Sequence, residues 1–480
     1  MIREKQIAVD EIDRKTPLIT DTADRIWEYA ELSLQEFKSA ALYCEVLEQE
    51  GFDVRRKVAG IETAFCASFG NGRPVIGILA EYDALSGLSQ KCGGLEQEEI
   101  VAGGNGHGCG HNLLGAGAMA AAIGVKAFLQ KTQSYGTVVL YGCPGEEGGA
   151  AKAFMARDGI WKDLDAALTW HPDDSNEIVT GSTNSCIQVQ YKFAGIASHA
   201  SGAPEKGRSA LDAVELMNIG VQFLREHVIP EVRMHYAITN TGGFSPNVVQ
   251  SEAEVLYLIR APKTPIVQET YERVNDIARG AALMTGTQVE ISFIKACSNF
   301  VVNDTLTDLV QKNMEETPLP ELTEEELSFA DSIQKSLEKK SDPLAPMLRL
   351  MPSEEAKKVR EKVDGPILNF VIPRIHANSV LPGSTDVGDV SWVCPTAQLT
   401  AAAWAAGTPA HSWQAVSQGK GSIAHKELLY AGKVLAGTAI DMIEHPEQIA
   451  KAKEELAEKL DHKPFVSPIP KEVKPKAIGM

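Results

Sequence analysis

Positive charge, long hydrophobic runs and cysteine are all scarce in this sequence. Its 480 residues contain 46 Lys and Arg against 64 Asp and Glu, which gives a formal net charge of −18 at pH 7. A chain this acidic repels phosphate backbones, and no local basic stripe offsets the repulsion, so we expect no binding to nucleic acid. The first residues, MIREKQIAVDEIDR, are charged and lack the apolar core of a signal peptide.

The most hydrophobic stretch, residues 113–129, is rich in Ala and Gly and is interrupted by Lys126. We expect it to be too short to span a bilayer and to form a buried helix, with no membrane association. The eight cysteines are too few for a disulfide scaffold in a chain of this length. Without a secretory signal they are expected to be reduced thiols of a cytoplasmic protein, most of them filling the core.

The order of apolar segments predicts an α/β fold. Residues 75–80, 137–141 and 166–169 are short continuous apolar runs, typical of strands buried on both faces of a sheet. Helical spacing predicts a helix over residues 39–51, and a second helix over residues 112–131 separates the first two strands. Strands that alternate with helices indicate a sheet with helices on its faces.

Residues 184–298 have a different texture and are predicted to form an inserted domain. The expected order of strand, helix, strand, strand, helix, strand is the ferredoxin-like arrangement. The α/β domain is therefore expected in two parts, residues 1–183 and residues 299–480. Within the second part, residues 315–365 are rich in Glu, Lys, Pro and Ser; a solvated helical excursion is the simpler interpretation, and a partner surface is the alternative.

Potential metal ligands follow each of the three predicted strands. They are Glu81 and Asp83 after the first strand, Cys109 and His111 in the glycine-rich segment GHGCGH downstream, Glu146 and Glu147 after the second strand, and His171 after the third. Because ligands gather beyond the carboxyl ends of strands in open α/β sheets, we expect these side chains to converge on one crevice. Thiolate, imidazole and carboxylate groups are typical ligands of zinc or manganese.

Two further groups are candidates for the same site. Glu146 and Glu147 follow a buried strand and are bracketed by glycines, so one can bind metal while its neighbour stays free as a general base. His411 lies in a tight loop and His425 is a competitor for the same role. Spacing alone does not choose between these two histidines.

The inserted segment carries its own polar set, in which His199, Asn247 and Arg260 are the candidates for substrate contact. Arg260 ends an apolar strand, and a guanidinium is the natural partner of a carboxylate. On spacing alone, an arginine that simply faces water is equally expected there. Trp170 and Trp413 adjoin two of the proposed ligands and either stack on an aryl ring or wall the site.

Together these motifs resemble the M20 family of metallopeptidases and amidohydrolases, in the branch that cleaves N-acyl and N-aryl amino acids. The resemblance runs almost from end to end, through Asp83-Ala84-Leu85, GHGCGH, PGEEGG, WHP, the HAxxPxxGxxA motif that begins at His199, and PNVV. It implies a zinc-peptidase-like catalytic domain with a mixed sheet flanked by helices, plus an inserted ferredoxin-like α+β lid and dimerisation domain. It also implies hydrolysis of an amide between an acyl or aroyl group and an amino acid, with p-aminobenzoyl-glutamate as the expected substrate.

The resemblance further assigns roles to single residues. Two divalent ions per chain, Zn²⁺ or Mn²⁺, would be held by Cys109, His111, Glu147, His171 and His411, which favours His411 over His425. Glu146 would be the catalytic base, and Asp83 would orient a ligand. His199, Asn247 and Arg260 would meet the free carboxylate and the scissile carbonyl of the substrate. His199 would act across the interface of a homodimer, or of a heterodimer with a related subunit.

Three features depart from that family pattern. Asn112 stands where the branch has Asp, Glu81-Tyr82-Asp83 replaces the usual Asp-x-Asp, and the 315–365 segment has no counterpart in short members. The alternatives are therefore a dipeptidase or another N-acyl-amino-acid hydrolase of the same family, and a non-catalytic partner subunit.

Overall fold

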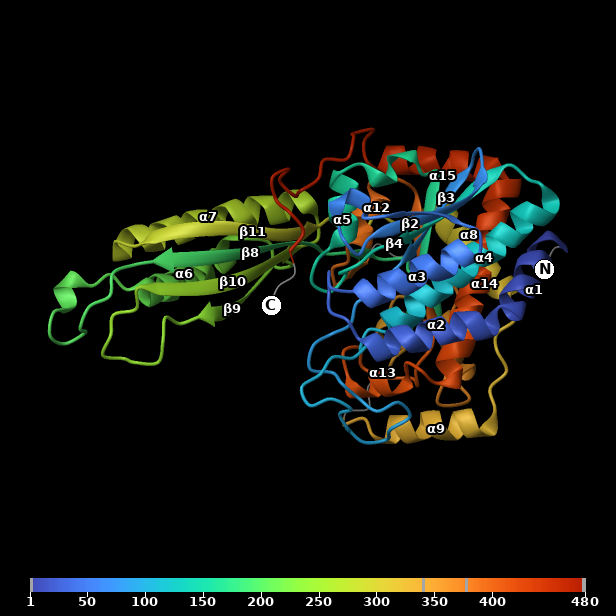
Figure 1. Cartoon of the computed structure of the whole chain (residues 1–480), viewed down its shortest axis with the longest axis horizontal. Helices are drawn as coiled ribbons and strands as arrows, with labels where there is room; N and C mark the ends of the chain where they lie inside the picture. The colour runs from blue at the N-terminus through green and yellow to red at the C-terminus, as the bar shows by residue number, and fades with distance from the viewer. Residues whose placement is uncertain (1–2, 339–341, 376–378, 477–480) are drawn as a thin grey trace.

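The computed structural model describes residues 3–338, 342–375 and 379–476, and it shows a broad body from which a narrow arm extends (Figure 1). The body contains an eight-stranded mixed sheet with the order β1-β2-β4-β3-β5-β14-β6-β12. Its strands are β1 (Asp53–Arg56), β2 (Phe65–Asn71), β3 (Val75–Ala80), β4 (Gly136–Gly142), β5 (Ala166–Asp173), β6 (Ser175–Ile178), β12 (Leu368–Val371) and β14 (Thr396–Ala402). The three strands predicted from apolar runs are β3, β4 and β5, which confirms the α/β prediction.

The central strands β4, β3, β5 and β14 run parallel to one another, so their carboxyl ends lie at one edge of the sheet. Among the described residues, seven helices of at least twelve residues contribute buried side chains to the core on one face of this sheet. They are α1 (Arg3–Arg14), α2 (Thr16–Tyr29), α3 (Phe37–Gln49), α4 (His111–Thr132), α8 (Asp304–Glu316), α14 (Ser422–Glu444) and α15 (Pro446–Lys459). Helices α5 (Ala151–Arg157) and α12 (Val387–Ser391) pack on the other face.

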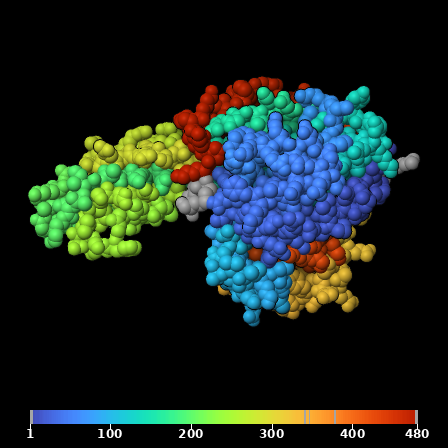
Figure 2. Space-filling model, in the orientation of Figure 1, coloured from blue at the N-terminus to red at the C-terminus, as the bar shows by residue number. Residues whose placement is uncertain are grey.

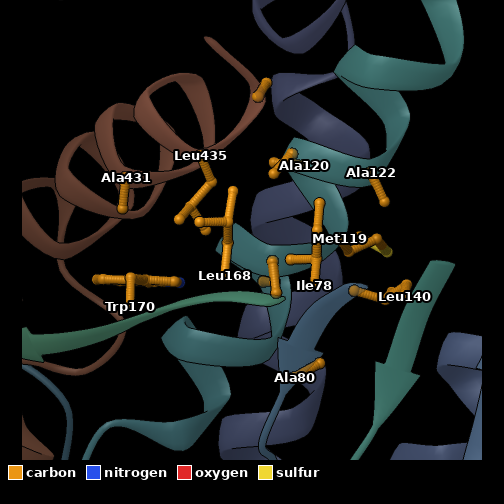
Figure 3. Close-up of a cluster of buried hydrophobic side chains, with 14 of the residues drawn as sticks. Ile78, Ala80, Met119, Ala120, Ala122, Leu140, Leu168, Trp170, Ala431 and Leu435 are labelled. Atoms are coloured by element: carbon orange, nitrogen blue, oxygen red, sulfur yellow. The ribbon is translucent and has the colours of Figure 1, made fainter. Parts of the chain in front are cut away.

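Helix α4 lies at the centre of the body, where it packs on the sheet and beside α14. Figure 3 shows Ile78, Leu140 and Leu168 of the sheet beside Met119 of α4 and Leu435 of α14. The helix has 22 residues and is long and apolar enough to cross a membrane, so the expectation that this run is too short was wrong. The expectation of a buried helix is confirmed, because 94% of its most apolar window is buried inside the protein.

The arm is a four-stranded antiparallel sheet with two helices on one face. Its strands β8 (Ser185–Ala194), β9 (Arg233–Asn240), β10 (Glu252–Ala261) and β11 (Gln288–Cys297) have the order β11-β8-β10-β9. Helices α6 (Ala210–Leu224) and α7 (Thr264–Thr285) share a core with the sheet. The chain order β8, α6, β9, β10, α7, β11 is the ferredoxin-like arrangement predicted from the sequence. In the space-filling view the arm, hereafter the lid, projects from the body (Figure 2).

The charged 315–365 segment is mostly helical, with α9 (Glu324–Lys335), α10 (Ala345–Leu348) and α11 (Ser353–Glu361). Helix α9 begins with a capping box in which Thr323 and Glu326 bond to each other's backbone. Its side chains Ala330 and Ile333 are buried against body residues such as Ile423. The segment is therefore a helical excursion with one face packed on the body.

Candidate metal centre

The carboxyl ends of β3, β4 and β5 carry the candidate ligands to one place. Strand β3 lies between β4 and β5 in the sheet, so the segments that follow these three strands are neighbours. Glu81 and Asp83 follow β3 directly, and Glu147 lies in the loop after β4. His171 differs slightly from the prediction: strand β5 extends to Asp173, so the histidine lies near the end of the strand and not in the loop beyond it.

The glycine-rich turn before α4 brings two more elements close. Gly110 has φ of 72°, and a Cβ there would lie 2.6 Å from Cγ of Pro172, the residue after His171. A Cβ on Gly108 would lie 3.2 Å from Cα of His411, whose backbone N–H donates to the Gly108 carbonyl at 2.9 Å. Glycine at these two positions therefore lets the β5 end and the His411 loop approach the turn that holds Cys109 and His111.

Two sets of ligand atoms meet at Cys109. One set is Cys109, His111 and His171, and the other is Cys109, Glu147 and His411; within each set the ligand atoms lie within 4.8 Å of one another. Cys109 Sγ is 3.5 Å from His171 Nε2, and His411 Nε2 is 3.3 Å from Glu147 Oε1. A third set, Glu81, His111 and Glu146, adjoins them. The structure thus gathers all five proposed ligands around one shared thiol.

Two orphaned polar atoms show that this donor set fits bound metal. His111 Nε2 and Glu147 Oε1 are buried, and among the described residues neither makes a well-aligned hydrogen bond, although Glu81 and His411 lie within 3.2 and 3.3 Å of them. Buried polar atoms without partners are costly, and a cation between the donor atoms would satisfy both. Burial also raises the pKa of the Cys109 thiol, so its thiolate needs a cation beside it.

Asp83 belongs to none of the ligand sets, but it orients two of the proposed ligands. Its Oδ1 lies 2.9 Å from His111 Nδ1, which leaves Nε2 turned toward the shared thiol. Its Oδ2 accepts from Ser33 Oγ at 2.7 Å and from the backbone N–H of Glu147 at 3.0 Å. These bonds hold the pKa of Asp83 well below its usual range despite burial, which raises it, and the bond to His111 is the largest lowering effect.

A buried charge network that the sequence did not reveal lies beneath the ligands. Lys152 of α5 is fully buried, and its Nζ lies 2.8 Å from Glu81 and 2.6 Å from Asp386. Glu81 Oε2 in turn lies 3.2 Å from His111 Nε2. The pKa of Glu146 is raised, first by burial and then by the nearby carboxylates of Glu81, Asp386 and Glu147. A lysine in a mostly apolar helix was the one available signal, whereas the residues around Asp386 indicate only a turn.

The two competing histidines occupy different places. His411 faces Glu147 in the centre, whereas His425 Nε2 lies 2.7 Å from Oδ1 of Asp24 on α2. Other residues singled out from the sequence belong to none of the ligand sets. Trp170 is fully buried and donates to the Leu114 carbonyl, so stacking on a substrate ring is excluded for it. Asn112 bonds to the Gly419 carbonyl, and Trp413 begins α13 (Trp413–Gln418) half-buried.

The lid carries Arg260 at one end and both His199 and Asn247 at the other. Arg260 lies at the base, where its Nη1 donates to Ser384 Oγ of the body at 3.5 Å. His199 and Asn247 lie in the two loops beyond the far ends of β8 and β10, and the backbone N–H of Ala200 donates to the Asn247 carbonyl. Strand β8 rises about 3.3 Å per residue, so its end at Ala194 is about 20 Å beyond Gln188 at the base. His199, which is exposed, therefore lies far from the metal centre of its own chain.

The sequence matches peptidase family M20/M25/M40 over residues 77–372. The chain belongs to this family. Among relatives of this M20 protein, a subunit of the p-aminobenzoyl-glutamate hydrolase of Escherichia coli (strain K12) is 48% identical over 97% of this chain and 97% of the relative. The other subunit named for the same hydrolase is 27% identical over 40% of this chain and 44% of that relative. Xaa-Arg dipeptidase of Mus musculus is 30% identical over 64% of this chain and 70% of the relative.

A solved M20 structure has the same fold. A dinuclear metal binding peptidase of the M20 family from Bacillus subtilis superposes with a TM-score of 0.52 at 18% identity, covering 90% of this chain and 99% of that chain. The resemblance stated from the motifs is thereby confirmed, and the chain is an M20 amidohydrolase with the body-and-lid architecture.

Proposed function

We propose that this M20 enzyme hydrolyses the amide bond between an acyl or aroyl group and an amino acid, with p-aminobenzoyl-glutamate as substrate and p-aminobenzoate and glutamate as products. The observation that carries the proposal is the pair of ligand sets that share Cys109, with the carboxyl group of Glu146 beside them. The 48% identity to a hydrolase named for this substrate supports the choice of amide.

Two divalent ions fit the donor set, with Cys109 shared, His111 and His171 on one side, and Glu147 and His411 on the other. Zn²⁺ or Mn²⁺ is the proposed metal, since a thiolate suits zinc and the carboxylate and imidazoles suit either. Bound in this way, the metal pair would lower the pKa of a water molecule and polarise the scissile carbonyl.

The residues of the chain supply the proton transfers and the substrate contacts. Glu146 accepts the proton of the attacking water and later delivers a proton to the departing amine nitrogen. Asp83 acts as a positioning residue, because it orients His111 through Nδ1. Arg260 receives the α-carboxylate, and His199 and Asn247 bind the carbonyl and carboxylate of the substrate.

His199 and Asn247 reach a metal centre only if a second protomer provides them, because the lid carries both away from their own centre. We therefore propose a dimer formed through the lid, either of two copies or with a related subunit. An exposed apolar stripe on helix α6 of the lid supports the dimer: Leu216, Ile219 and Phe223 are 38%, 56% and 71% exposed. The Escherichia coli relatives are named as two different subunits of one hydrolase, which fits the heteromeric form.

All eight cysteines are free thiols, which fits the cytoplasmic location that we propose.

The test is release of p-aminobenzoate from p-aminobenzoyl-glutamate by purified protein, first metal-free and then with Zn²⁺ or Mn²⁺. We expect metal-dependent release that Glu146→Gln lowers by about 10²- to 10⁴-fold without loss of bound metal. The exposed Glu62→Gln is the matched control and should keep full activity.

No release despite two bound ions per chain would refute this substrate. A panel that includes dipeptides and N-acyl amino acids, with and without a related subunit, would then separate the dipeptidase and the non-catalytic alternatives. A chain that binds no metal would refute the site assignment as a whole.

A further inference from the structure

Two cations at the base of the lid form no ion pair with a carboxylate among the residues that the structure describes. Lys295 of β11 is only 8% exposed, and its Nζ donates to the backbone carbonyl of Glu147 at 3.0 Å. Arg260 of β10 is half-buried, and its Nε is buried without a hydrogen-bond partner. By contrast, Lys192 on the same sheet forms an ion pair with Glu254 at 3.3 Å. Buried unpaired charges are costly, so this pair of cations indicates an anionic ligand.

The strand register places both cations on one face of the lid sheet. Arg260 is opposite Cys186 on β8, and Lys295 is opposite Gln188, two residues further along the same strand. Residues two apart on a strand point to the same face. That face is the one without helices, because the alternate residue Val189 is fully buried in the core that β8 shares with α6 and α7.

A β-bulge on β11 is what turns Lys295 to this face. Phe293 pairs with Val189 and contacts Tyr271 of α7, so it lies on the helix side of the sheet. Without the irregularity between Phe293 and Lys295, Lys295 would also point toward the helices. The extra residue shifts the register by one and directs the lysine toward the body, a known use of bulges beside active sites.

The spacing of the two cations suits a ligand with two carboxylates. Strands β11 and β10 flank β8, so their backbones are about 10 Å apart, and long side chains narrow that gap. Both charges act on Cys186 between them: its pKa is lowered to about 6, mostly by a hydrogen bond with Cys297 and then by Lys295 and Arg260. Lys295 also contacts the backbone of Glu147, a proposed metal ligand, so the ligand would lie next to the centre.

We propose that Lys295 and Arg260 form a dicarboxylate subsite at the lid base, in which Lys295 binds the side-chain carboxylate of the amino acid while Arg260 holds its α-carboxylate. The inference rests on the proposed function and adds a determinant of specificity to it: the enzyme prefers acidic amino acids because a neutral side chain leaves Lys295 buried without a partner. The net charge of −18 makes such a local pair of cations necessary for an anionic substrate.

The test compares p-aminobenzoyl-glutamate with p-aminobenzoyl-glutamine, which has nearly the same shape and one charge fewer. We expect wild-type enzyme to favour the glutamate compound, and Lys295→Met to lower its kcat/KM by about 10- to 100-fold while the glutamine compound changes by less than about threefold. Lys295→Arg should restore most of the preference. Lys192→Met, a cation removed from the same sheet, is the matched control and should leave the preference unchanged.

Two results would overturn the inference. Equal losses on both substrates in Lys295→Met would show that the lysine only supports the Glu147 loop. Full activity of Lys295→Met on both compounds would show that the lysine ammonium group does not contact the substrate. Thermal stabilisation by glutarate, absent in Lys295→Met, gives a readout without turnover. If wild-type enzyme cleaves neither compound yet shows this stabilisation, the proposed function fails and the subsite stands.

Discussion

Replacing Lys152 by methionine tests the buried charge network beneath the metal centre. Lys152 is fully buried, and its ammonium group lies between the carboxylates of Glu81 and Asp386, which are 3% and 0% exposed. Methionine has a similar length and volume, so the change removes the charge and leaves little cavity. Two buried carboxylates then share the space without a cation.

Removing one partner of a buried ion pair costs about 3 to 5 kcal/mol, because the remaining charge is left without compensation. We expect Lys152→Met to lower the free energy of unfolding by that amount at pH 8. The loss should be smaller at pH 5 than at pH 8. A carboxyl group whose pKa is higher in the folded than in the unfolded state makes the folded protein less stable as the pH rises above the unfolded-state pKa. Burial already raises the pKa of Asp386, which places it in this class.

The assay is denaturant unfolding of metal-free protein at pH 5 and pH 8, with Lys152→Met, Asp386→Asn and the double variant. The double variant should recover part of the loss, since one of the two buried charges is gone. Lys433→Met is the control, because its ion pair with Asp13 lies at the surface and is worth less than about 1 kcal/mol. A Lys152→Met protein as stable as wild type at pH 8 would refute the reasoning.

Three further predictions follow from single sites. Glu427 is fully buried without a hydrogen-bond partner among the described residues, and burial raises its pKa to about 8, so stability falls as the pH rises from about 4.5 to 8. Glu427→Gln should remove that slope and raise the free energy of unfolding at pH 8 by about 1 to 4 kcal/mol; an unchanged pH profile would contradict this. His411→Ala should lose bound metal, measured by atomic emission, while His425→Ala keeps it, and the reverse result would exchange their roles. Phe223→Glu should convert the proposed dimer into monomers, measured by sedimentation, and should lower the activity because His199 then no longer reaches a second metal centre. A variant that sediments like wild type would show that the apolar stripe on α6 is not the dimer contact.

Several elements of the body could be predicted because each has a local cause. Strand β3 is a six-residue apolar run that begins and ends where the sequence indicated, and α4 differs from its predicted helix by one residue at each end. Helix α3 begins and ends two residues before its predicted range of 39–51. Local patterns are weakest at such boundaries.

The candidate ligands could be proposed from sequence because each follows a predicted strand, and parallel strands end at one edge. Spacing gave no reason to prefer His411 over His425, since both lie in the last part of the chain, and only the close approach at Gly108 separates them in space. For a related reason Lys152 was missed and Asp386 was interpreted only as a turn residue. Their meaning depends on a contact between residues more than two hundred positions apart, and no local pattern records it.

The sequence by itself determined three of the parallel strands of the α/β body, the ferredoxin-like order of the lid, and the residue types able to hold metal, because these depend on periodicity and on chemistry carried by neighbouring residues. Only the tertiary structure decided which donor atoms share Cys109, which carboxylates surround Lys152, and that Lys295 and Arg260 face the same side of the lid. Those relations depend on strand order, on a one-residue bulge and on backbone approaches that glycine permits. All three arise from how distant segments pack, which no single stretch of the chain contains.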